Sequence, residues 1–199
     1  MATTELVAAL AATSWLEVAG VVTGFAYVAL AIREHRACWI AGAVSTALYL
    51  VVFMRARLYL QGGLQCAYLL LAAYGWWAWR RRGEADEGPV VRRAPARLQA
   101  GLLLAVGAAT LVTAPLLRAA TDAASPWLDA ATTWASIAAT GLLARKFVDN
   151  WSWWIVIDLA IGALAIAERL WLTGLLYVAF AVLAVVGLRR WSRAAAVAP

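Results

Sequence analysis

Apolar residues fill long stretches of this chain, and short breaks of charged or turn-forming residues separate them. Each stretch has 17 to 20 residues, enough for a helix to cross a bilayer core of ~30 Å at ~1.5 Å per residue. Pro126 and the Asp149–Asn150 pair mark helix starts. The pattern therefore predicts seven transmembrane helices, at Trp15–Ile32, Cys38–Met54, Leu60–Trp79, Leu98–Leu117, Trp127–Ala144, Trp151–Ala167 and Leu170–Leu188.

The composition excludes a soluble domain of any size. Hydrophobic residues make up 65% of the chain and charged residues only 14%, whereas a soluble domain carries about 25% charged residues. Cys38 and Cys66 both lie within apolar runs, so neither a disulfide framework nor a metal site is expected, and no cofactor is predicted. The fold class predicted is all-α, integral membrane.

The basic residues indicate an orientation in the membrane. With the N-terminus outside, only Arg55, Arg57, Arg118 and Arg169 of the 17 basic residues fall in outer breaks. The other thirteen fall in cytoplasmic breaks, as the positive-inside rule requires. The net charge of +6 therefore reflects topology, and nucleic-acid binding is not expected. The distribution therefore predicts an N-terminus outside and a C-terminus in the cytoplasm.

An internal repeat relates the two ends of the chain. Residues 112 positions apart are identical at Arg33/Arg145, Trp39/Trp151, Arg57/Arg169, Leu58/Leu170, Gly62/Gly174, Gly75/Gly187 and Trp79/Trp191. We therefore expect a first three-helix bundle over residues 1–79, a linker and connecting helix over 80–126, and a second bundle over 127–199. Such a 3+1+3 parallel repeat is typical of small-molecule transporters, whose substrate binds near the midplane between the halves.

The second bundle holds the densest candidate site. At about 100° per residue, Trp151, Trp154 and Asp158 share a helix face while Trp153 points away, and Asn150 precedes them. A carboxylate ~10 Å inside a membrane helix costs roughly 2.5–3.5 kcal/mol. Two indoles and a carboxylate would suit a flat cationic ring. Alternatively, the tryptophans form an interfacial belt and Asp158 pairs with another side chain.

The first bundle offers a matching polar stripe. Ser45 and Tyr49 lie one turn apart, and Gln61, Gln65 and Tyr68 follow one face of the next helix. Their amides and hydroxyls could bind ribose hydroxyls or a carboxamide. The alternative is hydrogen bonding between helices, which is common for polar groups within membranes.

These residues resemble those of the PnuC family of bacterial vitamin transporters. The matching segments are Trp15-Leu16-Glu17 with Gly20, Leu58-Tyr59 with Gln65, Tyr74-Gly75-Trp76-Trp77-Ala78-Trp79, Asp129, Ser136, Arg145-Lys146 and Asn150-Trp151 with Trp154. The resemblance implies a seven-helix, SWEET-like transporter of the bacterial inner membrane that moves a vitamin by facilitated diffusion, after which a cytoplasmic kinase phosphorylates and traps it. Nicotinamide riboside is the usual substrate of the family, and other members carry thiamine or riboflavin.

The sequence departs from that pattern at Ser45 and Asp158, where the nicotinamide riboside carriers that it resembles tend to have asparagine. We expect nicotinamide riboside as the substrate and keep thiamine as the alternative, since both carry a ring cation. The expected partners are this vitamin, membrane lipid and the kinase, and a homo-oligomer stays open. A membrane enzyme would need a clustered acid–base or metal constellation, which a lone Asp158 does not supply. A structural subunit would not need polar aromatic faces in both halves.

Overall fold

The computed structural model describes residues 15–55, 59–84, 91–121 and 125–197. Nearly all of this part of the chain is helical, and it contains no strand. The helices are α2 (Trp15–Ile32), α3 (Cys38–Arg55), α4 (Tyr59–Glu84), α5 (Ala96–Ala120), α6 (Pro126–Ala144), α7 (Asn150–Ala167) and α8 (Trp171–Val197). The all-α, seven-helix prediction is confirmed, and α6 and α7 begin at the predicted Pro126 and Asn150.

Two helices continue well beyond their predicted ends. The predicted end of α4 at Trp79 was too early by five residues, and that of α8 at Leu188 by nine. The apolar run does stop at both places, but arginine and alanine follow, and both are good helix formers. Hydropathy therefore located the edge of the apolar core, while the hydrogen-bonded helix runs on past it.

Within the described residues, five helices are long and apolar enough by themselves to cross a membrane: α2, α3, α5, α7 and α8. The other two, α4 and α6, carry more polar residues, such as Gln65 on α4 and Asp129 and Ser136 on α6. The two helices that are not apolar enough by themselves thus pack against each other.

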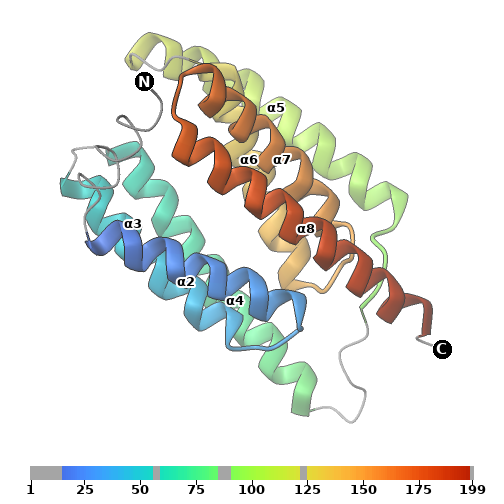
Figure 1. Ribbon diagram of the computed structural model, residues 1–199. Helices are drawn as coiled ribbons and strands as arrows, with labels where there is room; N and C mark the ends of the chain where they lie inside the picture. The colour runs from blue at the N-terminus through green and yellow to red at the C-terminus, as the bar shows by residue number, and fades with distance from the viewer. Residues whose placement is uncertain (1–14, 56–58, 85–90, 122–124, 198–199) are drawn as a thin grey trace.

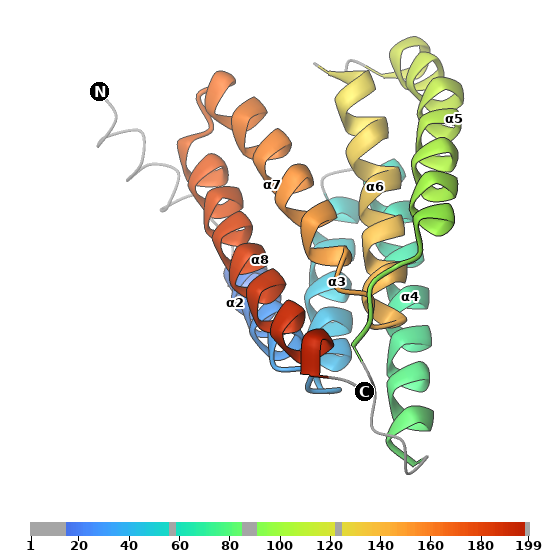
Figure 2. The same ribbon diagram turned by 90° about the vertical axis from the view of Figure 1, so that its right-hand side faces the viewer.

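Six helices form a closed ring. In order around the ring, the helices are α2, α3, α4, α6, α7 and α8. Each packs on the next, and α8 packs on α2. The seventh helix, α5, packs on α6 and lies outside the ring, as the views in Figure 1 and Figure 2 show. We refer to α2–α4 as the first half of the ring and to α6–α8 as the second half.

The packing of tryptophans in the first half recurs in the second, 112 positions later. Trp39 meets Trp79 edge-on at 5.5 Å and 88°, and Trp151 meets Trp191 at 5.5 Å and 86°. A Cβ added at Gly75 would overlap the Trp39 ring, and one at Gly187 would overlap the Trp151 ring. Both glycines are therefore needed because each lets an indole lie flat on a helix backbone.

The largest buried cluster lies at one end of the ring, which we call the turn end. It carries the turn at 33–37 between α2 and α3 and the turn at 145–149 between α6 and α7. Trp39, Trp79, Trp151 and Trp191 are all at least 96% buried there. Aromatic burial of this extent fixes the two halves against each other at that end.

Candidate substrate-binding site

Two cavities of similar size lie within the ring of helices. The first has a volume of ≈ 220 Å³ and the second of ≈ 230 Å³. Tyr27 of α2 and Trp154 of α7 line both of them. The two cavities are therefore neighbours with a shared wall.

The first cavity is lined mainly by α3 and α4 and is rich in hydroxyl and amide groups. Its polar side chains come from all three helices of the first half and from α6. They belong to Tyr27, Ser45, Thr46, Tyr49, Gln65, Tyr68 and Thr140, and the remaining lining residues are Trp39, Gly42, Ala72 and Trp154. Four of the five residues of the polar stripe in the first half, Ser45, Tyr49, Gln65 and Tyr68, are brought together here.

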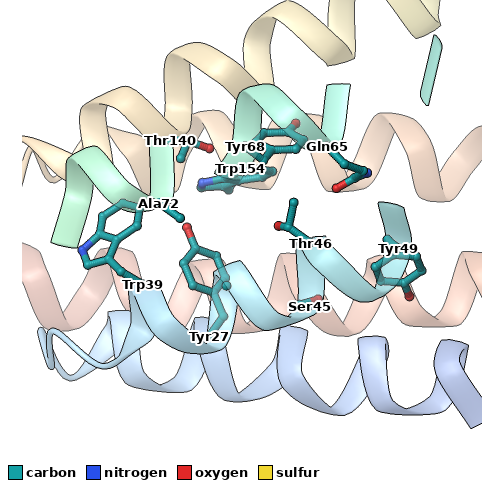
Figure 3. A pocket seen from close by; sticks show the side chains of 11 residues that line it. Tyr27, Trp39, Ser45, Thr46, Tyr49, Gln65, Tyr68, Ala72, Thr140 and Trp154 are labelled. Carbon is teal, nitrogen blue, oxygen red and sulfur yellow. The ribbon is translucent and has the colours of Figure 1, made fainter. Parts of the chain in front are cut away.

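Figure 3 shows how these side chains face the cavity. Tyr27 and Thr46 rise from α2 and α3 toward Trp154, Tyr68 and Gln65, which lie on the opposite side. The Thr140 hydroxyl donates to the backbone carbonyl of Ser136 at 2.8 Å, so one lone pair of that hydroxyl is still able to accept. The arrangement offers several donors and acceptors to a molecule with hydroxyl groups.

Two of the predicted residues also hold α2 and α3 together. The Ser45 hydroxyl donates to the carbonyl of Gly20 at 2.8 Å. The Tyr49 ring covers the same glycine, since a Cβ at Gly20 would lie 3.0 Å from it. For Ser45, helix–helix hydrogen bonding is thus observed beside its place in the cavity wall.

The second cavity is lined by aromatic residues and one carboxylate. Trp151, Trp154 and Asp158 of α7 face it together, as their predicted common helix face requires. The other side is formed by α8 and α2, with Tyr177, Phe180 and Ala184, and Gly24, Tyr27, Val28 and Ala31, and Leu143 of α6 completes the lining. Phe180 also stacks on Phe25 with ring centroids 4.8 Å apart, which closes the gap between α8 and α2.

Asp158 supplies the carboxylate that lines the second cavity and is only 5% exposed. Within the described part of the chain, no Lys, Arg or His forms an ion pair with its carboxylate. A charge buried in this way costs free energy unless a partner compensates it. A cationic ring in the second cavity would be such a partner, and the indoles of Trp151 and Trp154 would add stacking and cation–π attraction.

The comparisons with known proteins identify the chain's relatives. The model of the nicotinamide mononucleotide transporter family matches residues 14–193. The chain belongs to this family. Membership makes the protein a multi-pass membrane transporter and not an enzyme.

Individual members of the family match over most of their length. The nicotinamide riboside transporter PnuC of Escherichia coli is 25% identical, with 92% of this chain and 87% of the relative covered. The riboflavin/roseoflavin transporter RibM of Streptomyces davaonensis is 30% identical, with 89% of this chain and 84% of the relative covered. A crystal structure of the vitamin B3 transporter PnuC has the same fold, with a TM-score of 0.74 and 24% identity over 96% of this chain and 86% of that one.

Two residues of the family's Asn-Trp-x-x-Trp region, as it stands in this chain, lie away from the cavities. Asn150 is fully buried and its amide donates to the carbonyl of Phe147 at 2.6 Å, so it fixes the start of α7. It lines neither cavity, although we predicted it as a substrate-binding residue. Trp153 points away as predicted, and its indole donates to Gln99 of α5 at 2.9 Å. Gln61 lies where the structure does not describe side chains.

Sequence analysis missed several residues that line the cavities. Tyr177 and Phe180 were not singled out, although they stand 112 positions after Gln65 and Tyr68. Carrying the polar stripe of the first half across the repeat would have found both. For Tyr27 no such signal exists, because position 139 at the same spacing is alanine.

Proposed function

We propose that this transporter carries nicotinamide riboside across the bacterial inner membrane by facilitated diffusion. The observation that carries the proposal is the pairing of the two cavities at Trp154. One cavity offers a carboxylate and indoles, which suit the pyridinium ring. Its neighbour offers the hydroxyls and amide of Thr46, Gln65 and Tyr68, which suit the ribose.

The charge of Asp158 favours some vitamins over others. Nicotinamide riboside and thiamine both carry a ring cation, whereas the ring system of riboflavin is neutral. A buried carboxylate without a cationic partner among the described residues gains from a cation and gains nothing comparable from a neutral ring. Riboflavin, which the name of the relative RibM specifies, is therefore disfavoured here, and thiamine is the second candidate.

The transport cycle we propose is a rocking motion of the first half of the ring against the second about the two cavities. The N-terminus lies outside and the C-terminus in the cytoplasm, because that orientation places thirteen of the 17 basic residues on the cytoplasmic side. No coupling ion takes part, and phosphorylation by a cytoplasmic kinase keeps the vitamin inside the cell.

Uptake by the purified protein in liposomes tests the proposal. Labelled nicotinamide riboside should enter in a saturable manner, and uptake should persist when ionophores collapse proton and sodium gradients. Empty liposomes are the control. Absence of saturable uptake would reject the substrate, and uptake that stops with the ionophores would reject facilitated diffusion.

Competition separates the candidate substrates. Excess unlabelled thiamine should compete with nicotinamide riboside because it carries a cationic ring, and riboflavin should compete far less. Stronger competition by thiamine than by unlabelled nicotinamide riboside would make thiamine the substrate. Strong competition by riboflavin would show that Asp158 does not select for charge.

A further inference from the structure

Glu34 and Lys146 occupy matching places in the two turns at the turn end of the ring. They stand 112 positions apart, and both have left-handed backbones, with φ of 57° and 58°. The next residue in each turn closes the helix in the same way, His35 N–H donating to Leu30 at 2.9 Å and Phe147 N–H donating to Leu142 at 3.0 Å. The left-handed conformation is unfavourable for residues other than glycine or asparagine. The side chains of Glu34 and Lys146 are therefore expected to make a contact that glycine could not make.

These two side chains form an ion pair between the halves of the ring. Lys146 Nζ lies 2.9 Å from Glu34 Oε2. Lys146 is only 2% exposed and Glu34 25% exposed. The ammonium also lies 4.6 Å from the centre of the Trp79 ring, which belongs to the first half. The positive charge of the second half is thus held by groups of the first.

Reciprocal contacts surround the pair. The Trp79 indole donates to the carbonyl of Ala144 at 3.1 Å, and the Trp191 indole donates to the carbonyl of Ile32 at 3.2 Å. Each indole thereby caps the last residue of the first helix of the other half. The two rings are neighbours, with centroids 6.3 Å apart and ring planes tilted by 43°. The turn end is closed by contacts that run in both directions between the halves.

The turn that carries Lys146 has a further anchor. Arg92 donates its backbone N–H to the carbonyl of Lys146 at 3.2 Å and accepts from Val148 at 2.9 Å. Ala94 N–H donates to the Asp149 carboxylate at 2.6 Å. Because the segment 91–94 leads directly into α5, the position of Lys146 is tied to the helix outside the ring.

We propose that the Glu34–Lys146 ion pair is a latch, which holds the turn end closed and must break once in each transport cycle. The inference rests on the proposed function, since it concerns the closure of the same pathway. An ion pair suits this task because water can solvate both charges once the halves separate, whereas in the closed state the Glu34 carboxylate and the Trp79 ring help to compensate the buried Lys146 ammonium.

The thiol of Cys38 reports on the latch without requiring any substrate. Cys38 is fully buried at the start of α3, four residues after Glu34, and the chain's other cysteine, Cys66, is exposed. In a Cys66→Ala background, a maleimide should therefore label Cys38 slowly. Glu34→Gln and Lys146→Gln should each raise the labelling rate about tenfold, equivalent to ~1.4 kcal/mol.

The matched control exchanges the two charges. Because the two positions share one backbone conformation, Glu34→Lys combined with Lys146→Glu can rebuild the pair with reversed polarity. This double variant should label as slowly as the parent. A rate as fast as in the single variants, or single variants no faster than the parent, would overturn the proposal.

A reversible cross-link tests the opening step directly, and it serves also where the single variants do not fold. Glu34→Cys and Lys146→Cys are combined in a chain with Cys38→Ser and Cys66→Ala, and a short bifunctional thiol reagent joins them. Nicotinamide riboside uptake should stop in the linked protein and return after reduction. Undiminished uptake by linked protein would refute the latch, whereas absence of uptake by the parent chain would refute the proposed function and leave the labelling result standing.

Discussion

The two cavities are built on equivalent positions and differ in chemistry. Gln65 and Tyr68 line the first, and the residues 112 positions later, Tyr177 and Phe180, line the second. Thr46 in the first corresponds likewise to Asp158 in the second. Where the first half has Gly42, whose missing side chain leaves room for the Tyr27 ring, the second has Trp154. The frame is common to both halves, and the difference lies in the side chains that would meet an unsymmetrical substrate.

The largest expected effect is on stability, from substitutions at the packing positions that both halves share. Gly75→Leu and Gly187→Leu should each lower the free energy of unfolding by ~3 kcal/mol or more, since each new side chain would overlap a buried indole. Thermal unfolding in detergent measures the loss. Gly63→Leu is the control, because a Cβ there meets nothing within 4 Å. Destabilisation by only one of the two substitutions would break the equivalence of the halves.

Asp158→Asn removes the charge that distinguishes the second cavity. Affinity for nicotinamide riboside and for thiamine should fall roughly tenfold to a hundredfold, the worth of a charged hydrogen bond at ~1.5–3 kcal/mol. Quenching of tryptophan fluorescence gives the affinity. The folded protein should be no less stable, because the variant no longer buries a charge.

Thr46→Val, at the equivalent position of the first cavity, is the control: it removes one neutral hydrogen-bonding group, so it should weaken binding of nicotinamide riboside by no more than ~0.5–1.5 kcal/mol and leave thiamine, which has no ribose, unaffected. If Asp158→Asn improved binding of nicotinamide riboside and weakened binding of thiamine, the carboxylate would be a thiamine-selective feature. Unchanged binding of both would make Asp158 a structural residue.

Trp154→Ala should weaken substrate binding by ~1–3 kcal/mol, the range for stacking of a base on an aromatic side chain. Trp153→Ala is the matched control, because that indole contacts Gln99 of α5 and lines neither cavity. Titration of both variants with nicotinamide riboside measures the difference. An equal loss in both would assign Trp154 a packing role.

The smallest effects are expected from removing single polar groups of the first cavity. Tyr68→Phe reproduces Phe180, and together with Gln65→Leu it should lower affinity for nicotinamide riboside by ~0.5–1.5 kcal/mol per lost hydrogen bond. 1-Methylnicotinamide keeps the pyridinium cation but lacks the ribose and serves as the probe for contrast, so its binding should not change. A similar loss for 1-methylnicotinamide would place the ring, and not the sugar, in the first cavity.

The sequence predicted those features that depend on a single periodicity. Apolar run lengths located the helices, and the 100° rotation per residue placed Trp151, Trp154 and Asp158 on one wall. No pattern in the sequence indicates which residues of distant helices contact each other. Tyr27 looks like any aromatic residue of an apolar run, and its position between two cavities follows only from the ring closure. Lys146 was interpreted as a topology signal, because its partner Glu34 stands in another turn.

The polarity of α4 and α6 has a consequence for how the protein is made. A segment enters the bilayer on its own only if its side chains favour lipid, and these two helices are not among the five that are apolar enough by composition. Because α4 packs on α3 and α6 packs on α7, each can leave the insertion machinery together with an apolar neighbour. Substitutions that add polar groups to these helices would then reduce the yield of inserted protein before they affect transport. The apolar composition of α3 and α7 thus limits how polar α4 and α6 can become.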